Sequence, residues 1–222
     1  MQQAEWKEQY FVRFDSNIEN SIDTTGTGWY LKGDSLRTTT APDSVAVDTI
    51  MYFFRAWQIN DRLVYENPAT VSVDSALVVK ALYSKHIQVT VTTTVGAGTK
   101  VLVDDSEEDA PFSAQWLSDY SHSIGVNPYQ EITERSRYSF NRWLHGGERV
   151  QNIAPAESDI FIAKLDTQYY VEMNTSPVEL TEIQGSNWYN AGATVEFPAI
   201  ENIIEKDNKF WRFKGWHING QD

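Results

Sequence analysis

The chain has 222 residues, a formal net charge of −13 and no cysteine. The lack of cysteine excludes disulfides, thiolate metal sites and a cysteine nucleophile. The negative charge disfavours nucleic acid and anionic lipid as partners, and no apolar run is long enough to predict membrane insertion.

The first predicted element is a strand over Tyr10–Phe14, where aromatic and β-branched residues dominate. A second strand is predicted at Tyr52–Trp57, which has the pattern aromatic-x-Phe-x-x-Trp and is followed by the turn pair Asn60-Asp61. Alternating aromatics before residues that tolerate a positive φ are typical of a strand that enters a hairpin. Leu77–Tyr83 is predicted to be a closing strand.

The next stretch begins with Ile87–Val91, an alternating strand with one buried and one wet face. It carries an insert at about 96–112, which we expect to form a loop. Tyr138–Trp143 is a second copy of the aromatic pattern, and Gly146-Gly147 predicts another hairpin turn. Ile160–Leu165 is the predicted closing strand of this stretch.

The last stretch begins with a strand over Tyr169–Met173. Ile200–Asp207 does not alternate and predicts a short helical turn. Trp211–Trp216 is the third copy of the aromatic pattern, and Asn219-Gly220 is its turn pair. The sequence then ends before any counterpart of the two closing strands.

The spacing of the tryptophans predicts three tandem repeats. A second tryptophan precedes the last tryptophan of each aromatic pattern by 28, 27 and 28 residues. The pairs are Trp29 with Trp57, Trp116 with Trp143, and Trp188 with Trp216. We place the repeats at 1–84, 85–167 and 168–222, and we expect Trp57, Trp143 and Trp216 to be core residues.

The ends of the repeats carry two further expectations. No linker rich in proline, glycine or serine separates them, which predicts a rod rather than separate beads. The third repeat lacks its closing strand, and an open sheet edge is a template for another strand, so we expect self-association there. A continuation of the chain, a neighbouring molecule or the N-terminal segment Met1–Lys7 of another copy can supply the strand. Of these we favour a continuation of the chain.

Three further motifs accompany the aromatic pattern. They are Trp29-Tyr30-x-x-Gly33, which recurs as Trp188-Tyr189-x-x-Gly192; Asn67-Pro68-x-x-Val71-x-Val73-Asp74; and Ala81-x-Tyr83. Together they resemble the divergent internalin B-type repeats of bacterial and archaeal cell-surface proteins. The second repeat departs from this pattern at Leu117 and Tyr120, and it has no Asn-Pro pair after Trp143.

The resemblance implies a small β-rich, grasp-like module that is used in tandem in surface stalks and adhesins, without catalysis. We therefore predict an all-β to β-rich α+β chain of three such modules in an elongated rod, the third incomplete at its C-terminal end.

The insert supplies candidate metal ligands. Its acidic residues Asp104, Asp105, Glu107, Glu108 and Asp109 have the hard oxygen atoms that suit Ca²⁺. The run lacks the spacing of a dedicated calcium loop, and the same composition is typical of a solvated insert.

Four aromatic residues outside the repeat pattern are candidates for contacts with a partner: Trp6, Tyr65, Phe112 and Tyr129. No phosphate-binding, zinc-protease or serine-hydrolase motif is present.

We expect a non-catalytic, extracellular structural or interaction module, a fragment of a cell-surface stalk, S-layer-like protein or adhesin. Its expected partners are other surface proteins or glycans. The alternative is a carbohydrate-binding module or an accessory domain of a secreted hydrolase. Met1 to Tyr10 has no apolar stretch, so we expect signal and anchor to lie outside this segment.

Overall fold

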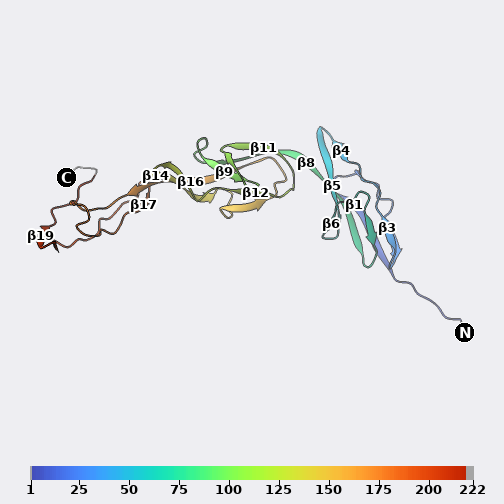
Figure 1. The fold of residues 1–222 in the computed structure, drawn as a ribbon. Helices are drawn as coiled ribbons and strands as arrows, with labels where there is room; N and C mark the ends of the chain where they lie inside the picture. The colour runs from blue at the N-terminus through green and yellow to red at the C-terminus, as the bar shows by residue number, and fades with distance from the viewer. Residues whose placement is uncertain (1, 219–222) are drawn as a thin grey trace. The chain divides into compact units, whose positions relative to one another are not determined.

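The computed structural model describes residues 2–218 and shows β-strands and no helix in that range (Figure 1). The predicted β-rich fold class is confirmed, in its all-β form. Within the described residues there is accordingly no helix that is able to span a membrane.

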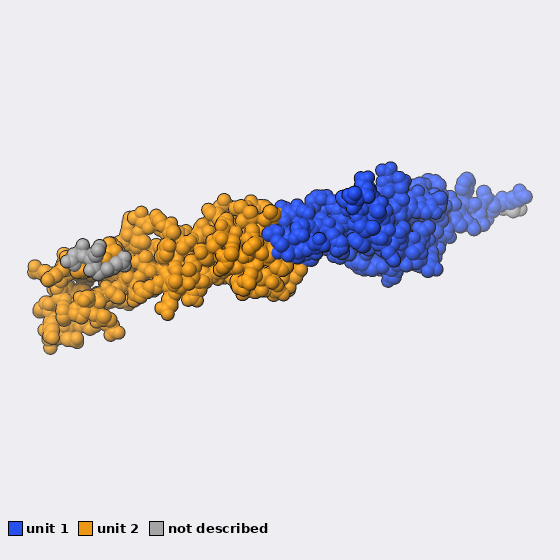
Figure 2. Space-filling view, turned by 90° about the horizontal axis from the view of Figure 1, so that it is seen from above, with its two compact units in different colours: residues 1–90, 113–122, 153–159 blue, residues 91–112, 123–152, 160–222 orange. Residues whose placement is uncertain are grey.

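The chain divides into two compact units, which Figure 2 colours separately. Unit 1 comprises residues 1–90, 113–122 and 153–159, and unit 2 comprises residues 91–112, 123–152 and 160–222. The strands wholly or mainly in unit 1 are β1 (Gln9–Ser16), β2 (Gly28–Leu31), β3 (Ser35–Arg37), β4 (Ser44–Val47), β5 (Ile50–Ile59), β6 (Arg62–Val64), β7 (Thr70–Ser72), β8 (Leu77–Thr93) and β11 (Phe112–Leu117). Those of unit 2 are β9 (Lys100–Val103), β10 (Ser106–Asp109), β12 (His122–Gly125), β13 (Tyr129–Thr133), β14 (Ser136–Trp143), β15 (Val150–Ile153), β16 (Asp159–Val171), β17 (Asn187–Asn190), β18 (Ile203–Lys206) and β19 (Lys209–Arg212).

The main sheet of unit 1 is built around the first half of β8, which lies between β1 and β5. β1 runs parallel to β8, with Val12 opposite Leu77 and Ser16 opposite Ala81. β5 runs antiparallel to β8 and also pairs with β4 and β6, while β2 pairs with β1. The strands β3 and β7 form a separate two-stranded sheet.

The core of unit 1 follows from the alternation of its strands. Val12, Trp57, Val73, Val79 and Ala81 all have 0% of their surface exposed. Every second residue of a strand faces the same side, so the apolar positions of β8 collect on one face. Apolar area removed from water stabilises by about 25 cal/mol per Å², which makes this cluster the main source of stability in the unit.

A β-bulge explains the spacing inside the aromatic pattern. Residues three apart in a regular strand face opposite sides, yet Phe54 lies opposite Tyr83 and Trp57 lies opposite Ala81, two positions along β8. The register shifts between Phe54 and Ala56, so Arg55 is the extra residue. The bulge therefore places both rings on one face, where they meet edge-on at 5.9 Å.

The second copy of the pattern has the same construction in unit 2. The register of β14 on β16 shifts between Phe140 and Arg142, so that Phe140 faces Leu165 and Trp143 faces Ala163. The two aromatic rings meet at 6.3 Å with an interplanar angle of 60°, against 61° in the first copy. Trp143 is fully buried, so the predictions that Trp57 and Trp143 are core residues are confirmed.

The buried indole N–H groups have hydrogen-bond partners in both copies. Trp57 Nε1 donates to Asn67 Oδ1 at 3.4 Å, and the Asn67 side chain also binds the backbone N–H and C=O of Ala41. Trp143 Nε1 donates instead to the carbonyl oxygen of Arg149 at 3.2 Å. This difference accounts for the second repeat's lack of an Asn-Pro pair, because a backbone oxygen replaces the asparagine.

The insert at 96–112 is not the loop that the sequence predicts. Residues 100–103 and 106–109 form the antiparallel strands β9 and β10. Asp104 and Asp105 have φ values of 47° and 66°, the left-handed values that a two-residue hairpin turn needs. Aspartate tolerates this conformation, so the acidic run closes a hairpin.

The predicted helical turn at Ile200–Asp207 is also wrong. Residues 203–206 form β18, which pairs with β19 across a turn at Asp207 and Asn208. Both turn residues have a positive φ, 55° and 58°, so the chain reverses at once and does not coil.

The turns that follow the aromatic pattern differ between copies. Asn60-Asp61 joins β5 to β6 in a hairpin, as predicted. Gly146 and Gly147 take positive φ values, but the next strand, β15, pairs with β12, so the second predicted hairpin is wrong. The third copy is a strand only as far as Arg212, and its turn pair, Asn219-Gly220, lies outside the described residues.

A single strand runs through each predicted repeat boundary. β8 contains the closing strand of the first repeat and the opening strand of the second, and β16 does the same for the second and third. The division into three repeats stays a prediction, since the contacts of the chain define two compact units.

We predict that Trp57→Ala and Trp143→Ala each lower the free energy of unfolding by about 3–5 kcal/mol, because each removes a fully buried ring. Urea unfolding, followed by circular dichroism, measures this loss. A Trp57→Ala protein as stable as the wild type would refute the core role.

The bulge gives a second prediction. Deleting Asn141 should destabilise the protein about as much as Trp143→Ala, since the shortened strand turns either Phe140 or Trp143 to the opposite face. The control is Asn141→Ala, which keeps the residue count and loses the side-chain bond to Asp166, with an expected cost of about 1 kcal/mol or less. Equal unfolding midpoints for the deletion and the substitution would contradict the bulge.

Candidate functional site

Residues 168–222, the predicted third repeat, copy part of the local structure of the predicted first repeat at a constant offset. The hairpin β4–β5 pairs Val45 with Tyr52, and β18–β19 pairs Ile204 with Trp211, so both partners are shifted by 159 positions (204 − 45 = 159; 211 − 52 = 159). Phe213 meets Trp216 edge-on at 6.0 Å, as Phe54 meets Trp57 at 5.9 Å. Each residue of the third repeat can therefore be compared with one counterpart.

Three further contacts of the first repeat recur in the third repeat between residues that are shifted by the same 159 positions. They are the hydroxyl bonds Tyr30 to Gly26 O and Tyr189 to Gly185 O, the backbone bonds Phe54 N to Asp43 O and Phe213 N to Asn202 O, and the ring contacts Phe11 with Trp29 and Tyr170 with Trp188.

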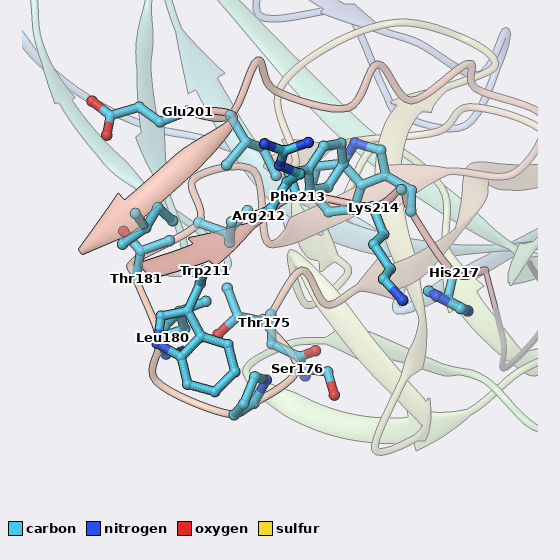
Figure 3. A pocket seen from close by; sticks show the side chains of 17 residues that line it. Thr175, Ser176, Leu180, Thr181, Glu201, Trp211, Arg212, Phe213, Lys214 and His217 are labelled. Atoms are coloured by element: carbon cyan, nitrogen blue, oxygen red, sulfur yellow. Dashed lines mark hydrogen bonds between the residues drawn. The ribbon is translucent and has the colours of Figure 1, made fainter. Parts of the chain in front are cut away.

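A cavity of about 640 Å³ opens within the third repeat (Figure 3). Its lining comes from two stretches of unit 2, residues 174–183 and 200–217. The apolar lining includes Leu180, Ile183, Ile204, Trp211, Phe213 and Trp216, and the polar lining includes Ser176, Glu201, Lys214 and His217. An apolar cavity with a few polar groups is the usual form of a binding site.

The comparison with the first repeat explains why the cavity is there. In the first repeat β8 covers Trp57, whose exposed surface is 0%. Within residues 2–218 no strand takes the place of β8 beside Trp216, because residues 213–217 are in no strand and β19 pairs only with β18. Trp216 lines the cavity and is half-buried, so the prediction that it is a core residue like Trp57 and Trp143 is wrong.

In each of the first two repeats one residue at the same position binds the closing strand through two hydrogen bonds. In the first repeat Asn17 N donates to Ala81 O at 3.1 Å, and Asn17 Oδ1 accepts from Tyr83 N at 2.8 Å. In the second repeat Thr94 makes the same two bonds, to Ala163 O at 2.9 Å and from Leu165 N at 3.1 Å.

The counterpart of Asn17 in the third repeat is Ser176 (17 + 159), which lines the cavity. Its backbone N–H and its hydroxyl are the same kinds of group that hold the closing strand in the other two repeats.

The four candidate contact residues do not form one site. Trp6 and Tyr65 in unit 1 are 92% and 68% exposed, and no ring contact joins any two of the four within residues 2–218. Phe112 is half-buried at the start of β11. None of the four lines the cavity of the third repeat.

Tyr129 already has a neighbour on its ring. The guanidinium carbon of Arg137 lies 3.7 Å from the centre of the Tyr129 ring and 4.2 Å from that of Trp188. Arg137 also donates to Gln168 Oε1 at 2.9 Å. The arginine is held by cation–π contacts and a hydrogen bond, and it covers part of the surface that a sugar ring would need.

Two of the five acidic residues of the insert, Glu107 and Asp109, are engaged by donors of the protein. Lys100 Nζ lies 2.6 Å from Asp109 Oδ1, and Asn127 Nδ2 donates to Glu107 Oε2 at 2.8 Å. The hydrogen bond with Asp109 raises the pKa of Lys100 above its ordinary value. Within residues 2–218 no three His, Asp or Glu side chains are grouped so that they could hold a metal ion, so the structure does not assemble the five predicted calcium ligands into a site.

Comparisons with known proteins give little support to any relationship. No protein-family model and no curated protein sequence matches the chain. A solved structure, "Streptococcal High Identity Repeats in Tandem (SHIRT) domains 3-4 from cell surface protein", matches with a TM-score of 0.22 and 13% identity over 71% of this chain and 96% of that chain. A TM-score this low does not establish a common fold.

The sequence pointed to the cavity only indirectly. The signal was the open sheet edge that was expected in the third repeat, and the structure adds the volume, the lining and Ser176.

Proposed function

We propose that the chain is a non-catalytic structural and interaction module of an extracellular surface protein, a segment of a stalk, S-layer-like protein or adhesin. We further propose that it belongs with the internalin B-type repeats it resembles, and that its partners are other surface proteins or glycans. The observation that carries the structural role is the shared strand: the closing strand of one repeat continues without a break as the opening strand of the next. Such a strand allows repeats to be added in tandem without separate linkers.

The order of the strands in the first repeat suits a module that bears force. Its opening strand β1 and its closing strand in β8 are parallel neighbours, paired from Val12–Leu77 to Ser16–Ala81. Tension along the chain pulls the start of β1 and the end of this part of β8 in opposite directions. Because the ladder bonds lie across that direction, they are loaded together and resist as a group.

We predict a directional difference in unfolding force, which optical tweezers measure. The chain has no cysteine, so pairs of introduced cysteines define the points of attachment. The exposed pair Gln9→Cys and Gln88→Cys pulls β1 and β8 past each other and should require the higher force. The control pair Gln9→Cys and Ser75→Cys attaches at the same end of both strands, opens the ladder bond by bond, and should require a lower force.

Equal forces for the two pairs would contradict a load-bearing role. A glycan array provides the second test: sugar binding that is lost in Trp6→Ala or Tyr129→Ala would favour the alternative, a carbohydrate-binding module or hydrolase accessory domain.

A further inference from the structure

The cavity of the third repeat lies where the first repeat has its closing strand. In the first repeat the closing strand lies between β1, to which it is parallel, and β5, to which it is antiparallel. The counterparts of these neighbours in the third repeat are residues 171–175 (12 + 159 to 16 + 159), of which only Val171 belongs to β16, and the stretch Trp211–His217. Residues 172–175 and 213–217 are in no strand, and both neighbours contribute to the lining of the cavity, through Asn174 and Thr175 on one side and Trp211–His217 on the other.

The other two repeats define the residues that the cavity accepts. A small residue faces the tryptophan in both: Ala81 opposite Trp57 and Ala163 opposite Trp143. Two positions further along the strand stands a large apolar residue, Tyr83 or Leu165, opposite the phenylalanine. The strand that fits beside Trp216 therefore carries alanine, one outward residue and a large apolar side chain.

The N-terminal segment of this chain has that pattern at the matching place. Ala81 precedes Thr94 by thirteen residues, and Ala163 precedes Ser176 by thirteen (94 − 81 = 176 − 163 = 13). Ala4 precedes Asn17 by the same thirteen residues, and Trp6 then takes the place of Tyr83 and Leu165. The N-terminal segment therefore precedes the first repeat at the same sequence spacing at which the closing strands in β8 and β16 precede the second and third repeats.

The segment is also unused within its own unit. Residues 2–8 are exposed and in no strand, and Trp6 has 92% of its surface exposed. The root of the segment is fixed, because Glu8 accepts hydrogen bonds from Lys32 Nζ at 2.8 Å and from the Tyr10 hydroxyl at 2.6 Å. An exposed tryptophan on an extended segment gains free energy when its apolar area is removed from water.

We infer that the N-terminal segment of a second copy docks as a strand into the cavity of the third repeat, with Ala4 opposite Trp216 and Trp6 opposite Phe213. The contact is head-to-tail, because it joins two different surfaces of the two copies. One feature weakens it: Gln2 stands where the other strands have the apolar residues Val79 and Phe161. Association should therefore be modest, and it should strengthen with salt, which screens the repulsion between copies of charge −13.

Sedimentation velocity of the full chain tests the inference with a matched pair of variants. The wild type should show an average mass that rises with concentration. Ala4→Glu puts a charge against Trp216 and should lower the association constant by at least about tenfold. Gln3→Glu adds the same charge one residue away, on the outward side, and should change it by less than about twofold. Both residues lie outside every described strand, so melting temperatures should be unchanged.

Disulfide trapping tests the register. Lys80 faces Gln58 in the first repeat. The counterpart of Lys80 in the N-terminal segment is Gln3, because Asn17 and Thr94 are 77 residues apart (80 − 77 = 3). The counterpart of Gln58 in the third repeat is His217 (58 + 159 = 217). A mixture of Gln3→Cys and His217→Cys chains should form a covalent dimer, because directly opposite residues approach within disulfide range. The Gln2→Cys chain is the control and should not.

Three results would overturn the inference. They are a wild-type protein that stays monomeric at about 0.5 mM, which sets any dissociation constant well above that value; equal association of Ala4→Glu and Gln3→Glu; and equal trapping of the Gln2→Cys and Gln3→Cys chains. The inference does not depend on the load-bearing role, since it rests on the register of the strands.

Discussion

The structure depends on one contact that it uses twice, a buried tryptophan that faces an alanine on the neighbouring strand. Trp57 lies opposite Ala81 and Trp143 opposite Ala163, and all four residues have 0% exposed surface. The alanine leaves room for the indole ring, and the bulge before the tryptophan brings the phenylalanine to the same face. Because this contact joins the aromatic strand to the closing strand, a repeat that lacks the closing strand keeps the aromatic edge contact but leaves a cavity beside its tryptophan.

Much of the fold was predictable because its strands alternate and their aromatics recur. The strands at Tyr10–Phe14 and Ile160–Leu165 and the core roles of Trp57 and Trp143 follow from period-two patterns. The bulge also left a signal, since two aromatic rings three residues apart in a strand reach the same face only if the strand is bulged. The hairpin at the insert was missed because its acidic run was interpreted as a loop, and the hairpin at 203–212 was missed because Ile200–Asp207 does not alternate and was interpreted as a helical turn. In both hairpins the two turn residues have a positive φ. The pairing of β15 with β12 has no local signal, because it depends on contacts distant in the sequence.

The same geometry links structure to the proposed roles. A closing strand that continues as the next opening strand makes each repeat depend on its neighbour, which suits a tandem surface module. Parallel terminal strands suit the transmission of force. The candidate site followed only in part from the sequence: the open edge was expected, whereas Ser176 and the role of Ala4 emerged from comparing hydrogen bonds across the repeats. The four candidate aromatics did not converge, because they lie on separate segments of the chain. The acidic residues share one hairpin, but within residues 2–218 they do not form a group that could hold a metal ion.

The central claim is that the predicted third repeat copies the first and that, within residues 2–218, it has no strand in the place where the first repeat has its closing strand. The most direct measurement is hydrogen exchange of the full chain with and without a synthetic peptide of the sequence Leu77–Lys85. The account predicts that the peptide protects the backbone amides of residues 213–217, and that a peptide with arginine in place of Ala81 does not. Amides at 213–217 that are already as protected as those of residues 54–58, or equal protection by both peptides, would contradict it.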